Sequence, residues 1–132
     1  MYPQTRGAVA YQHTSVQSSS PLELVVLLYD GALRHLVAAR DATLRNDLMA
    51  RREAFSKVMA IITELQSTLN LEQGGQVAAS LDSLYTYIIG RLIESTARKD
   101  VAALEEVERL LRPLREAWSA IAAEPAAVGT PR

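Results

Sequence analysis

Hydrophobic residues recur at helical spacing along most of the chain, and the pattern divides it into four segments. Apolar side chains repeated every three or four positions fall on one face of a helix with 3.6 residues per turn. We therefore expect helices over about Pro21 to Arg45, Leu48 to Leu69, Val77 to Lys99 and Val101 to Ala122. The predicted fold class is all-α, and long helices joined by short connections favour an antiparallel four-helix bundle.

Polar residues mark where these helices begin. Ser20 precedes a proline and lies three positions before Glu23, which is the composition of a capping box with a first-turn proline. Asn46 or Asp47 is placed to cap the second helix, and Asp100 is placed to cap the fourth. These signals fix the register of the helices that follow them.

Two positions oppose helix formation. The stretch NLEQGGQ, residues 70–76, contains a glycine pair that is unfavourable inside a helix, so it predicts a loop. Pro113 interrupts the last helical pattern and is expected to kink that helix or to open one hydrogen bond. Neither signal changes the number of predicted helices.

The ends of the chain lack a sustained helical pattern. Residues 1–19 lead into the polar run QSSS, residues 17–20, and are expected to form a mobile N-terminal arm with scattered apolar anchors. Residues 20–122 are expected to form the bundle, and residues 123–132 a flexible C-terminal tail. The predicted organisation is one domain with two extensions.

Three helices carry the apolar stripe that a bundle core requires. For the second helix the stripe is Phe55, Val58, Ile61, Ile62, Leu65 and Leu69. For the third it is Val77, Leu81, Leu84, Tyr85, Ile88 and Leu92. For the fourth it is Leu104, Val107, Leu110, Leu111, Leu114, Trp118 and Ile121. Each set lies within one arc of a helical wheel, so all three helices are predicted to face a common core.

The first helix has more apolar surface than one core can cover. From Leu22 to Tyr29 every residue except Glu23 is apolar. A helical wheel places three residues toward the core, namely Leu24, Leu27 and Leu28. It places three on the opposite face, namely Leu22, Val26 and Leu33. The third helix has a similar surplus outside its stripe at Tyr87, Ile89 and Ile93.

The surplus has two interpretations. It indicates either a wide core or homodimer interface, or a groove that takes an apolar helix or extended segment of a partner. In the second interpretation the N-terminal arm is placed to cap the groove when no partner is bound, so that a partner must displace it. The periodicity leaves both interpretations open.

Composition narrows the possible functions. The chain has 132 residues, 14 Lys and Arg against 15 Asp and Glu, and a formal net charge of -1, which argues against a general nucleic-acid binder. It has no cysteine and no apolar run of membrane-spanning length, and its N-terminal stretch does not resemble a signal peptide. We therefore expect a cytoplasmic protein without membrane insertion.

The sequence offers no constellation for catalysis or metal binding. The two histidines are His13, in the arm, and His35, whose spacing to acidic residues does not match a di-iron motif. No serine lies in a nucleophile motif, and EQGGQ lacks the residues of a phosphate-binding loop. We expect no catalytic residue, no metal and no cofactor, and hence no enzyme.

Several blocks resemble the FliS family of flagellar export chaperones. They are SPLELVVLLYDGAL at residues 20–33, EQGGQVAASLDSLYTYIIGRLIES at residues 72–95, and EEVERLL followed by LREAW, which ends at Trp118. The resemblance implies an antiparallel four-helix bundle without catalytic activity. It also implies that the bundle binds the disordered C-terminal segment of flagellin in the cytoplasm, prevents premature polymerisation and keeps the subunit competent for flagellar type III export.

The resemblance also implies a role for the arm, whose family tyrosine corresponds to Tyr11. The predicted partner-binding residues combine arm anchors with the surplus apolar positions, and they are Tyr11, Val16, Leu22, Val26, Leu33, Tyr87, Ile89 and Ile93. A co-chaperone or an export-gate component is a possible further partner, and a monomer or weak homodimer is expected. The alternative is a structural or regulatory homodimer whose extra apolar faces form the interface.

Overall fold

The computed structural model describes residues 20–124 and contains four helices within that range. Helix α2 spans Pro21–Leu44, α3 spans Leu48–Ser67, α4 spans Leu71–Arg98 and α5 spans Val101–Ala122. The expectations for the arm and for most of the tail lie outside the described residues.

Each helix begins at a side chain that accepts a backbone hydrogen bond. Ser20 Oγ accepts from the Glu23 N–H at 3.1 Å, and Glu23 Oε1 accepts from the Ser20 N–H at 2.9 Å, which confirms the predicted capping box. Asp47 caps α3 and Asp100 caps α5, as predicted. Asn70 caps α4, a role that the sequence reading missed.

The predicted loop at residues 70–76 is wrong. Helix α4 already begins at Leu71, and the glycine pair at residues 74 and 75 lies within the helix. Only Gly75 leaves the helical conformation, with φ 52° and ψ −130°. The cap at Asn70 allows one helical turn to form before the glycine interrupts it, so the break is a single residue instead of a loop.

Helix α5 continues through Pro113 to Ala122. A proline at this position removes the backbone N–H that would bond to the carbonyl of residue 109. Pro113 and Arg109 are both exposed, so water can satisfy that carbonyl. The missing hydrogen bond is therefore expected to cost little at this exposed position.

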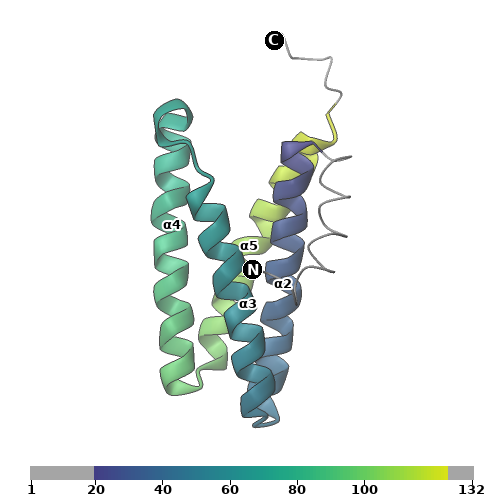
Figure 1. The fold of residues 1–132 in the computed structure, drawn as a ribbon, viewed down its shortest axis with the longest axis vertical. Helices are drawn as coiled ribbons and strands as arrows, with labels where there is room; N and C mark the ends of the chain where they lie inside the picture. The colour runs from purple at the N-terminus through teal and green to yellow at the C-terminus, as the bar shows by residue number, and fades with distance from the viewer. Residues whose placement is uncertain (1–19, 125–132) are drawn as a thin grey trace, which may run out of the picture.

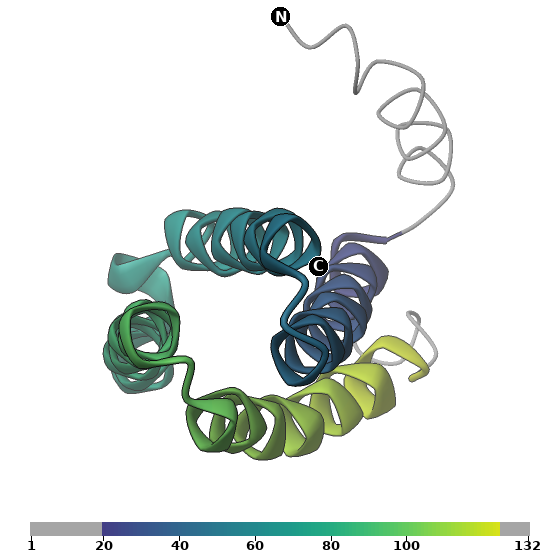
Figure 2. The same cartoon turned by 90° about the horizontal axis from the view of Figure 1, so that it is seen from below.

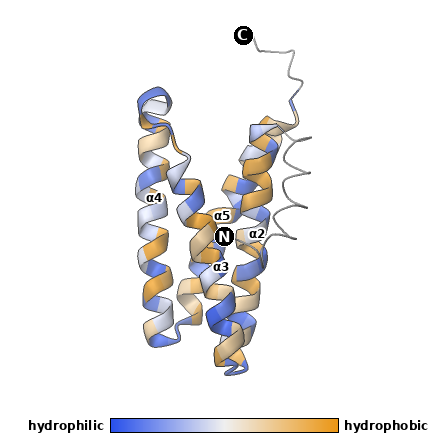
Figure 3. Ribbon diagram, in the orientation of Figure 1, coloured by the Kyte–Doolittle hydropathy of each residue, from blue (hydrophilic) through white to orange (hydrophobic). Residues whose placement is uncertain are grey.

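The four helices form a closed ring with antiparallel neighbours, which confirms the predicted bundle (Figures 1 and 2). Helix α2 packs against α3 and α5, and α4 packs against the same two helices, so α2 and α4 face each other across the ring. Hydrophobic and hydrophilic residues alternate along each helix (Figure 3), as expected for helices that bury one face. The largest fully buried side chains are Tyr29, Leu36, Val58, Ile62, Tyr85, Ile88, Leu92, Val107 and Leu111.

The two ends of the ring differ in the size of their core side chains. We call the end that holds the connections at 45–47 and 99–100 the narrow end, and the opposite end the open end. Buried side chains at the narrow end are small and include Ala39, Ala42, Ala54, Ser95 and Ala103. Because helix separation follows the size of the side chains at the contact, these residues allow close approach. At the open end, the upper end in Figure 1, the α3–α4 pair diverges from the α2–α5 pair.

Candidate binding cleft

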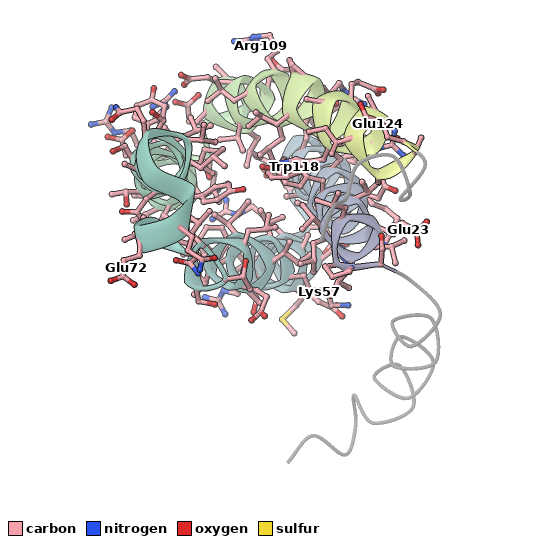
Figure 4. The ribbon with its side chains drawn as sticks, turned by 90° about the horizontal axis from the view of Figure 1, so that it is seen from above. Glu23, Lys57, Glu72, Arg109, Trp118 and Glu124 are labelled. Atoms are coloured by element: carbon pink, nitrogen blue, oxygen red, sulfur yellow. The ribbon has the colours of Figure 1, made fainter. Side chains whose placement is uncertain are left out.

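An apolar cleft of about 290 Å³ lies at the open end, between the two diverging helix pairs. All four helices contribute apolar side chains to it, and the main ones are Leu22, Val25, Leu65, Leu69, Val77, Leu81 and Trp118. In the view from above, Trp118 points into the space that the helices enclose (Figure 4). The cleft is therefore a hollow on the molecular surface with a mainly hydrophobic lining.

Two tyrosines close the inner side of this cleft. Tyr85 lines the cleft, and its hydroxyl lies 2.6 Å from the hydroxyl of Tyr29, which reaches across the ring from α2. Burial, followed by the hydrogen bond to Tyr29, raises the pKa of Tyr85 above its ordinary value, and burial also raises the pKa of Tyr29. Both phenols therefore stay protonated at neutral pH, and their hydrogen bond links α2 to α4 without a buried charge.

A second hollow, of about 390 Å³, lies between the beginning of α2 and the end of α5. Val26 and Leu27 line it from α2, and Ala122 and Ala123 line it from α5 and its cap. Glu23 and Ser119 form its polar edge. The two hollows lie on the two sides of the first turns of α2, because Leu22 and Val25 face the cleft while Val26 and Leu27 face this second groove.

Of the three α2 residues expected to face the core, only Leu28 packs against it, and Leu24 is half-buried outside the core cluster. The wheel assignment is clearly wrong at two residues. Leu33, expected on the outer face, is only 9% exposed and belongs to the core. Leu27, expected in the core, is 47% exposed. The reason is that α2 packs against both α3 and α5, so its buried arc is wide and centres on Tyr29, Ala32 and Leu36 instead of on the leucine-rich first turns.

The other predicted site residues of α2 and α4 are accessible. Leu22 and Val26 are half-buried, and each lines one of the two hollows. On α4, Tyr87 and Ile93 are exposed, whereas Ile89 is half-buried and packs against the core. These α4 residues do not line the cleft, so the structure divides the predicted set into at least two separate surfaces. Tyr11 and Val16 lie outside the described residues.

A charged network fixes the surface around Tyr87. The Tyr87 O–H donates to Glu106 Oε2 at 2.6 Å, and Arg91 Nε donates to Glu106 Oε1 at 2.7 Å. The hydrogen bond from Tyr87, together with that from Arg91, holds the pKa of Glu106 below its ordinary value. The same hydrogen bond raises the pKa of Tyr87. The aromatic ring is thereby held beside the α4–α5 contact.

Sequence reasoning missed several residues of the cleft by assigning them to the core. Leu69, Val77, Leu81 and Trp118 belong to the predicted core stripes, yet all four line the cleft, and Val77 is 67% exposed. Periodicity identifies the face on which a residue lies and not whether the opposite helix is near enough to cover it. The usable signal is the contrast in size between large residues at this end and alanines at the other.

The described residues show no arrangement suited to metal chemistry. Between residues 20 and 124, no three His, Cys, Asp or Glu side chains converge as metal ligands would. His35 is half-buried on α2, and burial lowers its pKa. None of the helices in this range is both long enough and apolar enough to cross a membrane. The arrangement is suited to holding an apolar segment by surface contact.

Comparison with known proteins identifies close relatives over most of the chain. The model of a family described as "Flagellar protein FliS" matches residues 4–125. The flagellar secretion chaperone FliS of Salmonella typhimurium is 42% identical over 120 residues, covering 87% of this chain and 89% of the relative. FliS of Bacillus subtilis is 35% identical over 83% of this chain and 80% of the relative. FliS of Escherichia coli is 33% identical over 96% of each chain.

Proposed function

Because the chain belongs to the FliS family of flagellar secretion chaperones, we propose that it binds the C-terminal segment of flagellin in the cytoplasm. Binding would prevent premature polymerisation and keep flagellin competent for type III export. The relatives carry the name flagellar secretion chaperone, which supports the general role. The identity of the bound segment is the proposal.

The observation that carries the proposal is the apolar cleft at the open end. A disordered client loses conformational entropy when it becomes ordered, so its affinity must come from extensive burial of apolar surface. The cleft, the second groove and the exposed side chains Tyr87 and Ile93 offer separate apolar contacts of this kind. A long segment that crosses several of them would gain from each.

We propose that the N-terminal arm takes part in this binding. Residues 1–19 join α2 at Ser20, and the next two residues, Pro21 and Leu22, line the cleft. We propose that Tyr11 and Val16 cover apolar surface near this junction in the free protein. A client would then displace the arm, which sets a threshold for binding.

Calorimetry with the full chain and a purified C-terminal segment of flagellin tests the proposal. We expect one segment per chain, with a gain of helix visible by circular dichroism. Leu22→Ser should weaken binding roughly tenfold, because it removes an apolar side chain from the cleft. Met49→Ser, at the narrow end where this side chain is 74% exposed, is the matched control and should leave binding unchanged.

Absence of binding to the segment would contradict the proposal. Equal weakening by Leu22→Ser and Met49→Ser would contradict the assignment of the cleft. Sedimentation at low concentration tests the alternative of a structural homodimer, which would persist as a dimer that takes up no segment. A co-chaperone and an export-gate component stay predictions that this experiment does not address.

A further inference from the structure

The first turn of α4 is separated from the rest of its helix. Gly75, with φ 52° and ψ −130°, interrupts the helix immediately after the turn Leu71–Gly74. Asn70 holds the turn locally, since its side-chain oxygen accepts from the Gln73 N–H at 2.9 Å and its carbonyl accepts from the Gly74 N–H at 2.7 Å. The backbone conformation of Gly75 is strongly disfavoured for residues that carry a Cβ. Glycine adopts it readily, so the chain can pivot at this point.

Burial does not anchor this turn to the bundle. Every residue from 71 to 77 is exposed, and the first buried residue of α4 is Ala78. Leu71 itself is 54% exposed. A segment held by local hydrogen bonds and few buried contacts belongs to the part of a protein that moves at low cost in free energy.

The turn lies at the edge of the cleft. Asn70, Gly74 and Val77 line the cleft, whereas Leu71 does not. An apolar segment seated in the cleft would offer Leu71 a surface on which to bury its exposed area. Closing of such an edge over a bound ligand is a common way to sequester it.

We propose that the turn Leu71–Gly74 is a hinged wall of the cleft, which pivots at Gly75 and closes Leu71 onto a flagellin segment bound there. The inference rests on the proposed function and adds a moving contact to it. Because the wall can adjust, the cleft can close around apolar side chains of different size.

A distance measurement tests this movement directly. The chain has no cysteine, so the double variant Leu71→Cys/Ala120→Cys can carry two spin labels at defined positions. Ala120 is exposed and lies near the end of α5. We expect the distance between the labels to shorten when the full chain is saturated with the C-terminal flagellin segment. Ala79→Cys/Ala120→Cys is the matched control, because Ala79 is exposed and lies beyond the pivot, and its distance should not change.

Two single substitutions sharpen the test. Gly75→Ala should abolish the shortening, and since an added Cβ meets no atom within 4 Å, its effect acts through the backbone alone. Leu71→Ser should weaken binding of the segment roughly fivefold, because about half of a leucine side chain is left without its contact.

The outcomes separate the two proposals. If the segment binds and neither distance changes, or both shorten equally, the hinge is refuted and the proposed function stands. Undiminished shortening in a folded Gly75→Ala variant would also refute the pivot. If no segment binds at all, the proposed function itself is refuted.

Discussion

At the narrow end of the bundle two hollows between the helices measure about 10 and 50 Å³, whereas two hollows at the open end measure about 290 and 390 Å³. Both ends are built from the same four helices. The narrow end buries alanines and a serine, which let neighbouring helices pack closely, whereas at the open end Trp118 and several leucines line a hollow. The size of core side chains along each helix can thus decide where a bundle stays closed and where it can receive a ligand.

The largest expected contrast is in stability. Leu36→Ala removes a side chain that is 1% exposed in the closed core and should lower the free energy of unfolding by about 2–5 kcal/mol. Leu81→Ala removes a half-buried side chain of the cleft and should cost about 1 kcal/mol, because water already reaches part of it. Denaturant unfolding measures both. Equal losses would show that the open end is packed as tightly as the core.

Enlarging an alanine should cost more stability at the narrow end than at the open end. Ala103→Leu overfills the narrow end and should cost about 1–3 kcal/mol of unfolding free energy. Ala78→Leu should cost less than Ala103→Leu, because Ala78 borders the cleft on one side. It should nevertheless weaken binding of the flagellin segment, measured by calorimetry. A stabilised Ala103→Leu variant would argue against close packing at the narrow end.

The hydrogen bond between the Tyr29 and Tyr85 hydroxyls lies at the inner side of the cleft and links its two walls. Tyr29→Phe leaves the buried Tyr85 hydroxyl without its partner and should cost about 1–3 kcal/mol. Adding Tyr85→Phe removes the unpaired hydroxyl. The double variant should therefore lose less unfolding free energy than the two single variants lose together. Denaturant unfolding of all four proteins gives the coupling energy. Strict additivity would mean that the two hydroxyls do not interact.

The smallest expected effect is on pH dependence. Because burial raises the pKa of Tyr29 and Tyr85, the unfolded chain releases these protons first as the pH rises past the ordinary tyrosine pKa of about 10. Their contribution to stability is thus complete below that pH and declines above it. Tyr29→Phe/Tyr85→Phe should flatten the decline, whereas Tyr87→Phe, on the outer surface, should leave more of it in place. Thermal melts from pH 8 to about 11 would check this.

Periodicity and capping signals in the sequence were sufficient to predict most of the fold. The starts of α2, α3 and α5 agree with the predicted ones, because Ser20, Asp47 and Asp100 cap locally. Much of the predicted core of α3 and α5 is confirmed, because each of these helices buries a single narrow stripe of apolar residues inside the bundle. The early start of α4 was missed because the glycine pair outweighed Asn70 as a signal.

The candidate site was less predictable than the fold. Burial of Leu33 depends on the two neighbours of α2, and a single-helix wheel contains neither of them. The exposure of Val77 and the position of Trp118 depend on how far apart the helix pairs lie at the open end. Such distances result from the packing of the whole ring and are not encoded in any local stretch of sequence.

Closure of the ring by its first and last described helices has a consequence for folding kinetics. Helix α2 packs along α5, and Arg115 Nε donates to Asp30 Oδ1 at 2.7 Å between residues 85 positions apart. The α2–α3 and α4–α5 hairpins close over short connections, so they should form before this distant seam. Interactions absent from the folding transition state slow unfolding when they are strengthened. The α2–α5 seam would then set the lifetime of the folded bundle more than the speed at which it forms.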